Sequence, residues 1–94
     1  MEGDPSVPNQ NPVGEAGALK ELVEQMARAL VDSPDQVTVD AADEEKALVL
    51  RLRVASSDIG RVIGKQGRTA KAMRVVLHAI AAKSKRRAIL EILE

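Results

Sequence analysis

The stretch Ile59-Gly-Arg-Val-Ile-Gly-Lys-Gln-Gly67 decides the fold of this chain. It places Gly64 and Gly67 three positions apart around Lys65 and Gln66, and a helical pattern starts directly after it. Glycine lets a turn approach another molecule closely because it has no side chain. Backbone N–H groups at the start of a helix favour an anion such as phosphate. The stretch therefore predicts a Gly-x-x-Gly turn between two helices that is suited to an anion.

Spacing excludes two other glycine-rich loops. A P-loop has four residues between its glycines and ends in Gly-Lys-Ser/Thr, whereas three residues separate Gly60 from Gly64 and Gln66 follows Lys65. The dinucleotide fingerprint Gly-x-Gly-x-x-Gly fails because its first two glycines are one residue apart. A tight turn without a ligand is an equal alternative for the bare motif, and only its surroundings favour binding.

Basic residues surround the glycine turn. Lys65 lies at its tip, Arg61 precedes it, and Arg68, Lys71 and Arg74 follow it. This pattern predicts contact with a nucleic-acid backbone. We expect Lys65 to contact phosphate and at least two of the other four to touch the nucleic acid, although each could be an ordinary solvated charge. Residues 83–87 are expected to form a basic connector, in which Lys85, Arg86 and Arg87 could extend this footprint or serve only as connecting residues.

Charge is unevenly distributed along the 94-residue chain, although its net charge is zero. Residues 1–50 hold three Lys or Arg against eleven Asp or Glu, a net charge of −8. Residues 51–94 hold eleven against three, a net charge of +8, and they include the glycine turn. The distribution of charge guides binding better than its total. Alternatively, the two halves attract one another across the fold.

Aromatic residues and cysteines are absent. RRM and OB-fold modules stack bases on aromatic rings, so this chain is left with backbone clamping and with aliphatic and polar contacts. Without cysteine there is no cysteine-based zinc site, and His78 stands alone, so we expect no metal site and no cofactor. No Ser/His/Asp ordering or carboxylate pair stands out, so we expect no catalytic residues and no enzymatic activity.

The N-terminal region differs in character from the rest. Residues 1–16 contain Pro5, Pro8 and Pro12 and little that could pack, so we expect a disordered tail. Residues 17–94 are expected to form one domain. The chain starts without the basic and apolar regions of a secretory signal, and no apolar run approaches the roughly 18 residues of a membrane span. These features favour a cytoplasmic location.

Hydrophobic periodicity predicts the first elements of the domain. Apolar residues at helical spacing indicate a helix over 18–31, which Pro34 ends. Alternation indicates a short strand over 36–40 and a second strand over 46–54. The polar residues 41–45 are expected to connect them, so the two strands predict a hairpin.

The remaining elements surround and follow the glycine turn. Residues 56–58 offer N-cap chemistry for a short helix over 58–63. A longer helix is predicted over 68–84 and a last strand over 88–94. The buried stripe of the longer helix is expected to comprise Met73, Val76, Leu77 and Ile80, with Ala70 at its margin. The order predicts an α+β domain with a three-stranded mixed sheet packed against three helices.

This element order resembles a type II KH domain, in which an extra helix and strand precede a strand–helix–helix–strand core. The residues most alike are Val62-Ile-Gly-Lys-Gln-Gly-Arg68 and Ala70-Lys-Ala-Met-Arg74. The resemblance covers about residues 18–94 and is strongest with small bacterial proteins that consist of one KH domain. One departure is Ala70, where many KH domains carry isoleucine.

The resemblance implies binding of single-stranded RNA in a narrow groove between the glycine turn, its flanking helices and the sheet edge. The positions that match the phosphate-contacting loop are Gly64, Lys65, Gln66 and Gly67. The positions that match aliphatic residues lining or supporting the groove are Ile59, Val62 and Ile63.

The resemblance also implies a cellular role. It suggests an RNA chaperone that pairs with a second KH-containing protein and affects cell elongation and peptidoglycan synthesis. The alternative is a protein-interaction subunit, a homodimer or heterodimer in which RNA contact is secondary. Val75 is expected on the exposed side of the longer helix and could belong to such a contact.

Overall fold

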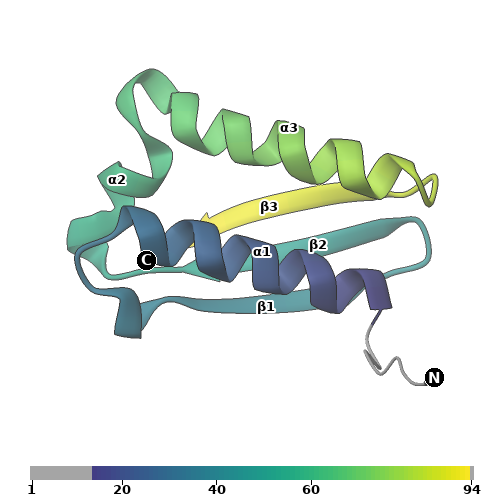
Figure 1. Ribbon diagram of the computed structural model, residues 1–94, viewed down its shortest axis with the longest axis horizontal. Coiled ribbons are helices and arrows are strands. Elements are labelled where there is room, and N and C mark those ends of the chain that lie inside the picture. Colours follow the sequence, from purple (N-terminus) through teal and green to yellow (C-terminus); the bar gives the residue numbers. More distant parts are fainter. Residues whose placement is uncertain (1–13, 94) are drawn as a thin grey trace, which may run out of the picture.

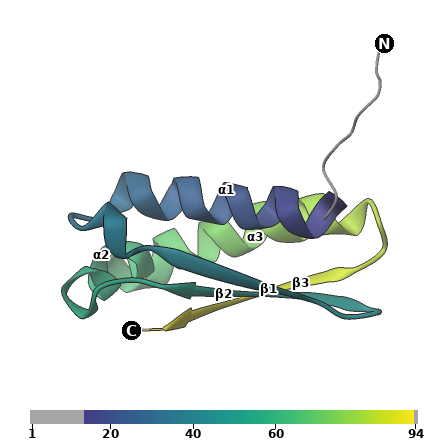
Figure 2. The ribbon, with the colours of Figure 1, turned by 90° about the horizontal axis from the view of Figure 1, so that it is seen from below.

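The computed structural model describes residues 14–93, in which two long helices lie on one face of a three-stranded sheet (Figures 1 and 2). The elements in chain order are α1 (Gly14–Leu30), β1 (Thr38–Asp43), β2 (Ala47–Arg53), α2 (Ile59–Ile63), α3 (Arg68–Ala82) and β3 (Arg87–Leu93). Short 3₁₀ turns lie at Pro34–Gln36, Ser56–Asp58 and Lys65–Gly67. The predicted α+β class and element order are confirmed.

The sheet is mixed, with β2 between β1 and β3. β1 pairs with β2 in antiparallel fashion, and β2 pairs with β3 in parallel with Leu50 opposite Leu90. A parallel pair needs a crossover connection, which α2, the glycine turn and α3 supply. The prediction that 41–45 is a polar connection was wrong in part. β1 continues to Asp43, opposite Leu48, because backbone pairing rather than side-chain polarity sets the end of this strand.

The core lies between the helices and the sheet face that they cover. Leu19 of α1, Leu50 of β2 and Leu77 of α3 are completely or almost completely buried within it. The predicted burial of Val76 was wrong, because its side chain is 43% exposed. The buried stripe of α3 is centred on Leu77 and includes the small residue Ala70, so α3 is rotated such that Val76 turns toward solvent.

Helix α1 begins four residues earlier than the expected position 18. Residues 14–16 of the expected tail are therefore helical, and Ala16 is buried. The extension is stabilised from a distance, because the Ser84 hydroxyl donates a hydrogen bond of 2.8 Å to the Glu15 carboxylate. The rest of that tail, residues 1–13, lies outside the described residues. Among the helices of residues 14–93, none is long and apolar enough to cross a membrane.

Candidate nucleic-acid interface

The glycine turn is closed by its own backbone. The Gly64 N–H donates to the carbonyl of Gly60 at 2.9 Å and ends α2, and the Gly67 N–H donates to the carbonyl of Gly64 at 3.0 Å. Gly64, Gln66 and Gly67 all have positive φ, of 80°, 58° and 74°. This backbone path leaves the side chains of Lys65 and Gln66 exposed at the tip.

The two glycines are required for different reasons. A Cβ at Gly64 would lie 2.8 Å from the backbone nitrogen of Thr69 and closer still to its hydroxyl, so only glycine fits. A Cβ at Gly67 would meet no atom within 4 Å, so only its left-handed backbone favours glycine there. Thr69 thus packs the turn against the first turn of α3. Sequence reasoning missed this contact, because threonine early in a helix carries no distinctive signal.

The positive charge of the turn continues onto α3. Lys65, Arg68 and Lys71 are exposed, and within residues 14–93 none of the three forms an ion pair. Helix α3 contains no acidic residue. Its N-cap, Gly67, provides no side-chain hydrogen bond, so the first N–H groups of the helix add a partial positive charge at the same place.

The other two predicted basic residues are held by the protein. Arg61 Nη2 lies 3.1 Å from Asp32 Oδ2, and its Nε lies 3.9 Å from Asp58 Oδ1. Arg74 Nη2 donates to the carbonyl of Leu90 at 3.2 Å and therefore lies along β3. Of the five predicted basic residues, Arg61 forms ion pairs and Arg74 is held by a backbone carbonyl, whereas Lys65, Arg68 and Lys71 form no ion pair within residues 14–93.

The aliphatic residues of α2 also differ in their surroundings. Val62 is completely buried in the core, so it supports the helix and cannot line a groove. Ile59 is partly buried and packs against that core. Ile63 is half-buried and directly precedes Gly64. Among the three, Ile63 and Ile59 keep surface that a ligand could contact.

An apolar pocket of about 320 Å³ lies between α1 and α3. Its lining carries no charge and consists of Met26, Ala29, Leu30, Thr69, Ala72, Met73 and Val76. Val75, which is not part of this lining, is exposed as predicted, at 60%. A phosphate has no charged partner in such a pocket, so its chemistry suits an apolar partner rather than a nucleic-acid backbone.

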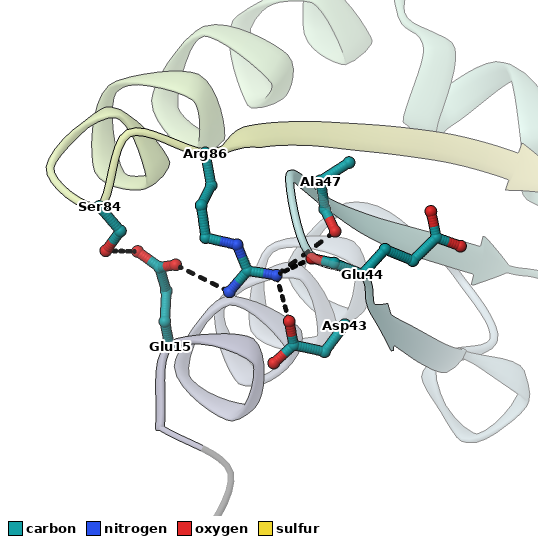
Figure 3. Close-up of polar contacts among 6 residues, drawn as sticks. All are labelled: Glu15, Asp43, Glu44, Ala47, Ser84 and Arg86. Carbon is teal, nitrogen blue, oxygen red and sulfur yellow. Dashed lines mark hydrogen bonds and ion pairs between the residues drawn. The ribbon is translucent and has the colours of Figure 1, made fainter.

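The basic run 83–87 lies at the opposite end of α3, and its Arg86 is neutralised there (Figure 3). Arg86 Nη1 lies 3.6 Å from Glu15 Oε1, while Nη2 contacts the Asp43 carboxylate and donates to the carbonyl of Glu44 at 2.6 Å. Glu15 and Asp43 belong to the acidic half of the sequence. The expected attraction between the two halves is confirmed for these pairs and for Arg61 with Asp32.

Comparison with known proteins places the chain among KH domains. The model of the KhpA/KhpB KH domain matches residues 20–92. The RNA-binding protein KhpA of Halalkalibacterium halodurans is 53% identical over 76 residues, which cover 81% of this chain and 100% of that protein. The RNA-binding protein KhpA of Aquifex aeolicus is 51% identical over 77 residues, covering 82% and 98%.

Solved structures agree at the level of the fold. The crystal structure of Era in complex with MgGDPNP and nucleotides 1506–1542 of 16S ribosomal RNA superposes with a TM-score of 0.62 at 20% identity. The superposition covers 99% of this chain and 35% of the Era chain. Within residues 14–93, no group of His, Asp or Glu is arranged to hold a metal ion. The family match and the identity to both relatives over most of the chain lead to one assignment: the chain belongs to the KhpA/KhpB family of KH domains.

Proposed function

We propose that the protein binds single-stranded RNA through the loop Gly64–Gly67 and the basic residues that follow it. The observation that carries this proposal is the set Lys65, Arg68 and Lys71, which is exposed and without ion pairs in residues 14–93 beside the start of a helix that has no acidic residue. Arg74 adds positive charge along β3, whereas Arg61 shares its charge with two carboxylates. The names of the KhpA relatives support RNA as the ligand.

The loop would clamp phosphates rather than read bases. Its glycines allow the RNA backbone to approach, and Lys65 and the N-terminal end of α3 would meet the phosphate charge. Bases would contact aliphatic side chains such as Ile63 and Ile59, because the chain has no aromatic residue for stacking. Affinity should therefore be modest, and it should fall as salt rises because counterions are released from the RNA.

The test is RNA binding by the Lys65→Asp/Gln66→Asp variant, compared with the wild type at low and moderate salt. A matched control, Lys83→Asp/Lys85→Asp, changes two exposed residues at the far end of α3. We expect the loop variant to lose at least about tenfold in affinity, while the control loses much less and both keep the wild-type circular dichroism. An equal loss of affinity in both variants, or an unchanged affinity in the loop variant, would contradict the proposal.

By family resemblance, we propose a cytoplasmic role as an RNA chaperone and post-transcriptional regulator that acts with a KhpB-like partner. On the same basis we link it to cell elongation and peptidoglycan homeostasis. An RNA-annealing assay with the loop variant tests the chaperone activity directly. The link to elongation is tested by measuring cell length after the chromosomal gene is replaced by that variant. An unchanged cell length would contradict this link.

The second candidate function is a dimerisation subunit, supported by the exposed face of α3. Four of its five exposed apolar positions have the spacing of one helix face and are arranged symmetrically along it: Ala72, Val75, Val76 and Ala79. An antiparallel second copy would place Val75 against Val76 and Ala72 against Ala79. The pocket between α1 and α3 adjoins this face and could receive the partner's side chains.

Sedimentation tests this second function. Val75→Glu/Val76→Glu should be monomeric at concentrations where the wild type and a His78→Glu control are dimeric. In the antiparallel pairing Arg68 faces Lys83 of the other copy, so added salt should favour this dimer while it weakens RNA binding. A wild type that sediments as a monomer at every concentration and salt would remove the self-association hypothesis.

A further inference from the structure

Asp58 is a buried carboxylate that the RNA-binding proposal does not use. It is the one buried charged residue within 14–93, with 1% of its surface exposed. Its Oδ1 accepts a hydrogen bond of 3.2 Å from the Asp32 N–H, and its Oδ2 accepts one of 3.1 Å from the Ser33 N–H. The prediction that residues 56–58 cap α2 was wrong for this side chain, because Asp58 makes no capping hydrogen bond to α2.

These bonds join two segments that are distant in sequence. Asp32 and Ser33 lead from the end of α1 to the turn at Pro34, whereas Asp58 directly precedes α2. At 1.5 Å per residue, the five residues of α2 span only about 8 Å, and Gly64 follows them. Because α2 is so short, fixing the position of its first residue also restricts the position of its last residue. The position of Asp58 therefore contributes to where the glycine turn lies, together with buried Val62 and the contact of Gly64 with Thr69.

The negative charge of Asp58 would by itself weaken RNA binding, so electrostatic attraction cannot explain a benefit of this residue. A buried carboxylate is costly unless it is hydrogen-bonded and paired, and the two N–H groups together with Arg61 Nε at 3.9 Å meet that need. Negative charge close to a phosphate-binding turn would otherwise weaken binding. The benefit of a carboxylate here is geometric, because a single group accepts two backbone N–H bonds at once.

We propose that Asp58 is a positioning residue for the RNA-binding turn: its carboxylate anchors the start of α2 to the segment after α1 and thereby orients Gly64–Gly67. The inference rests on the proposed function for its effect on RNA. Its structural part, the anchoring of α2, stands independently of any ligand.

Asp58→Asn tests the inference, with Asp32→Asn as the matched control. Both variants remove one negative charge from the same cluster, but the Asp32 side chain is 72% exposed and its N–H donor is retained. Electrostatics alone would raise the RNA affinity of both variants. Positioning predicts that Asp58→Asn lowers affinity at least about fivefold under conditions where it is folded, while Asp32→Asn binds as well as the wild type or better. An increase in both variants would overturn the inference.

Amide hydrogen exchange of the RNA-free proteins separates this inference from the proposed function. In Asp58→Asn, exchange should accelerate at residues 32–33 and 59–67 while the amides of α3 and β3 keep their protection. Unchanged exchange at 59–67 would overturn the anchoring even if the wild type binds no RNA. If Asp58→Asn does not fold, Asp58→Glu keeps the charge and shifts the carboxylate by one methylene. That variant should show the same exchange pattern, and wild-type exchange in it would also count against the inference.

Discussion

The two ends of this domain carry similar runs of basic residues but use them differently. At one end lies the turn between α2 and α3; at the other, the start of α1, the β1–β2 hairpin and the α3–β3 turn meet (Figure 1). Lys65, Arg68 and Lys71 have no ion pair at the first end within the described part of the chain. At the second end Arg86 is surrounded by acceptors, although its exposed neighbours Lys83, Lys85 and Arg87 have no ion pair within that part either. A local density of positive charge therefore does not by itself identify an interface.

The difference arises from what the fold brings to each end. The α3–β3 turn meets Glu15 from α1 and Asp43 from the hairpin, so its arginine is neutralised (Figure 3). Helix α3 carries no acidic residue toward the other end. About 22 Å of helix separates the two ends, which exceeds the screening length of about 8 Å at physiological salt. The two charge clusters can thus be changed independently.

The largest effect should come from Gly64→Ala at the loop end. The new Cβ would collide with Thr69, and the backbone, with φ 80° and ψ 168°, lies in a region reserved for glycine. We expect the free energy of unfolding to fall by about 3 kcal/mol. Gly67→Ala, which has free space but a left-handed backbone, should cost about 1 kcal/mol. Urea denaturation followed by circular dichroism measures both, and equal losses would mean that the Thr69 contact is not what requires glycine.

Next in size is Arg86→Met at the opposite end. The substitution leaves Glu15 and Asp43 without their shared cation, and we expect a loss of about 2 kcal/mol in unfolding free energy, less than for a fully buried pair. RNA affinity of the folded variant should stay at the wild-type value. Arg87→Met, at an exposed neighbour, serves as the control and should change stability by about 0.5 kcal/mol or less. A loss of RNA binding in Arg86→Met would break the distinction between the two ends.

A smaller effect should separate two lysines at opposite ends of α3. Lys71→Gln should reduce RNA affinity severalfold and lower the slope of log K against log salt by about 0.7, as expected for one lost phosphate contact to a single strand. Lys83→Gln should leave both quantities unchanged. Fluorescence anisotropy over a salt series measures the slopes. An equal decrease of the slope in the two variants would show that the RNA footprint extends along the whole helix.

The smallest effect concerns backbone conformation, because each end of the domain contains one non-glycine residue with a positive φ. Gln66 and Lys85 each have a φ of 58°, a left-handed conformation that glycine adopts at lower cost. Lys85→Gly should therefore raise the free energy of unfolding by about 0.5 to 1 kcal/mol without changing RNA affinity. Lys83→Gly, at a right-handed position, should lower it by about the same amount. Thermal denaturation distinguishes the two signs, and destabilisation by Lys85→Gly would refute the backbone argument.

Much of the fold could be predicted from local pattern. The alternation in 46–54 predicted β2 because one of its faces packs against the helices, and the helical spacing after Gly67 predicted α3. Errors arose where a distant segment decides the outcome. β1 extends beyond its apolar part because β2 pairs with it, and Val76 is exposed because the buried stripe of α3 runs through Ala70, Met73, Leu77 and Ala81 instead.

For the candidate site, the sequence alone determined the glycine turn, the unequal division of charge and the lack of stacking residues, since each depends only on residue type and spacing. Tertiary structure decided which charges stay unpaired. Arg61 and Arg86 meet carboxylates that lie far away in the chain, and Asp58 binds backbone N–H groups more than twenty residues away rather than its own helix. Such pairings depend on three-dimensional proximity, which local spacing along a chain does not encode.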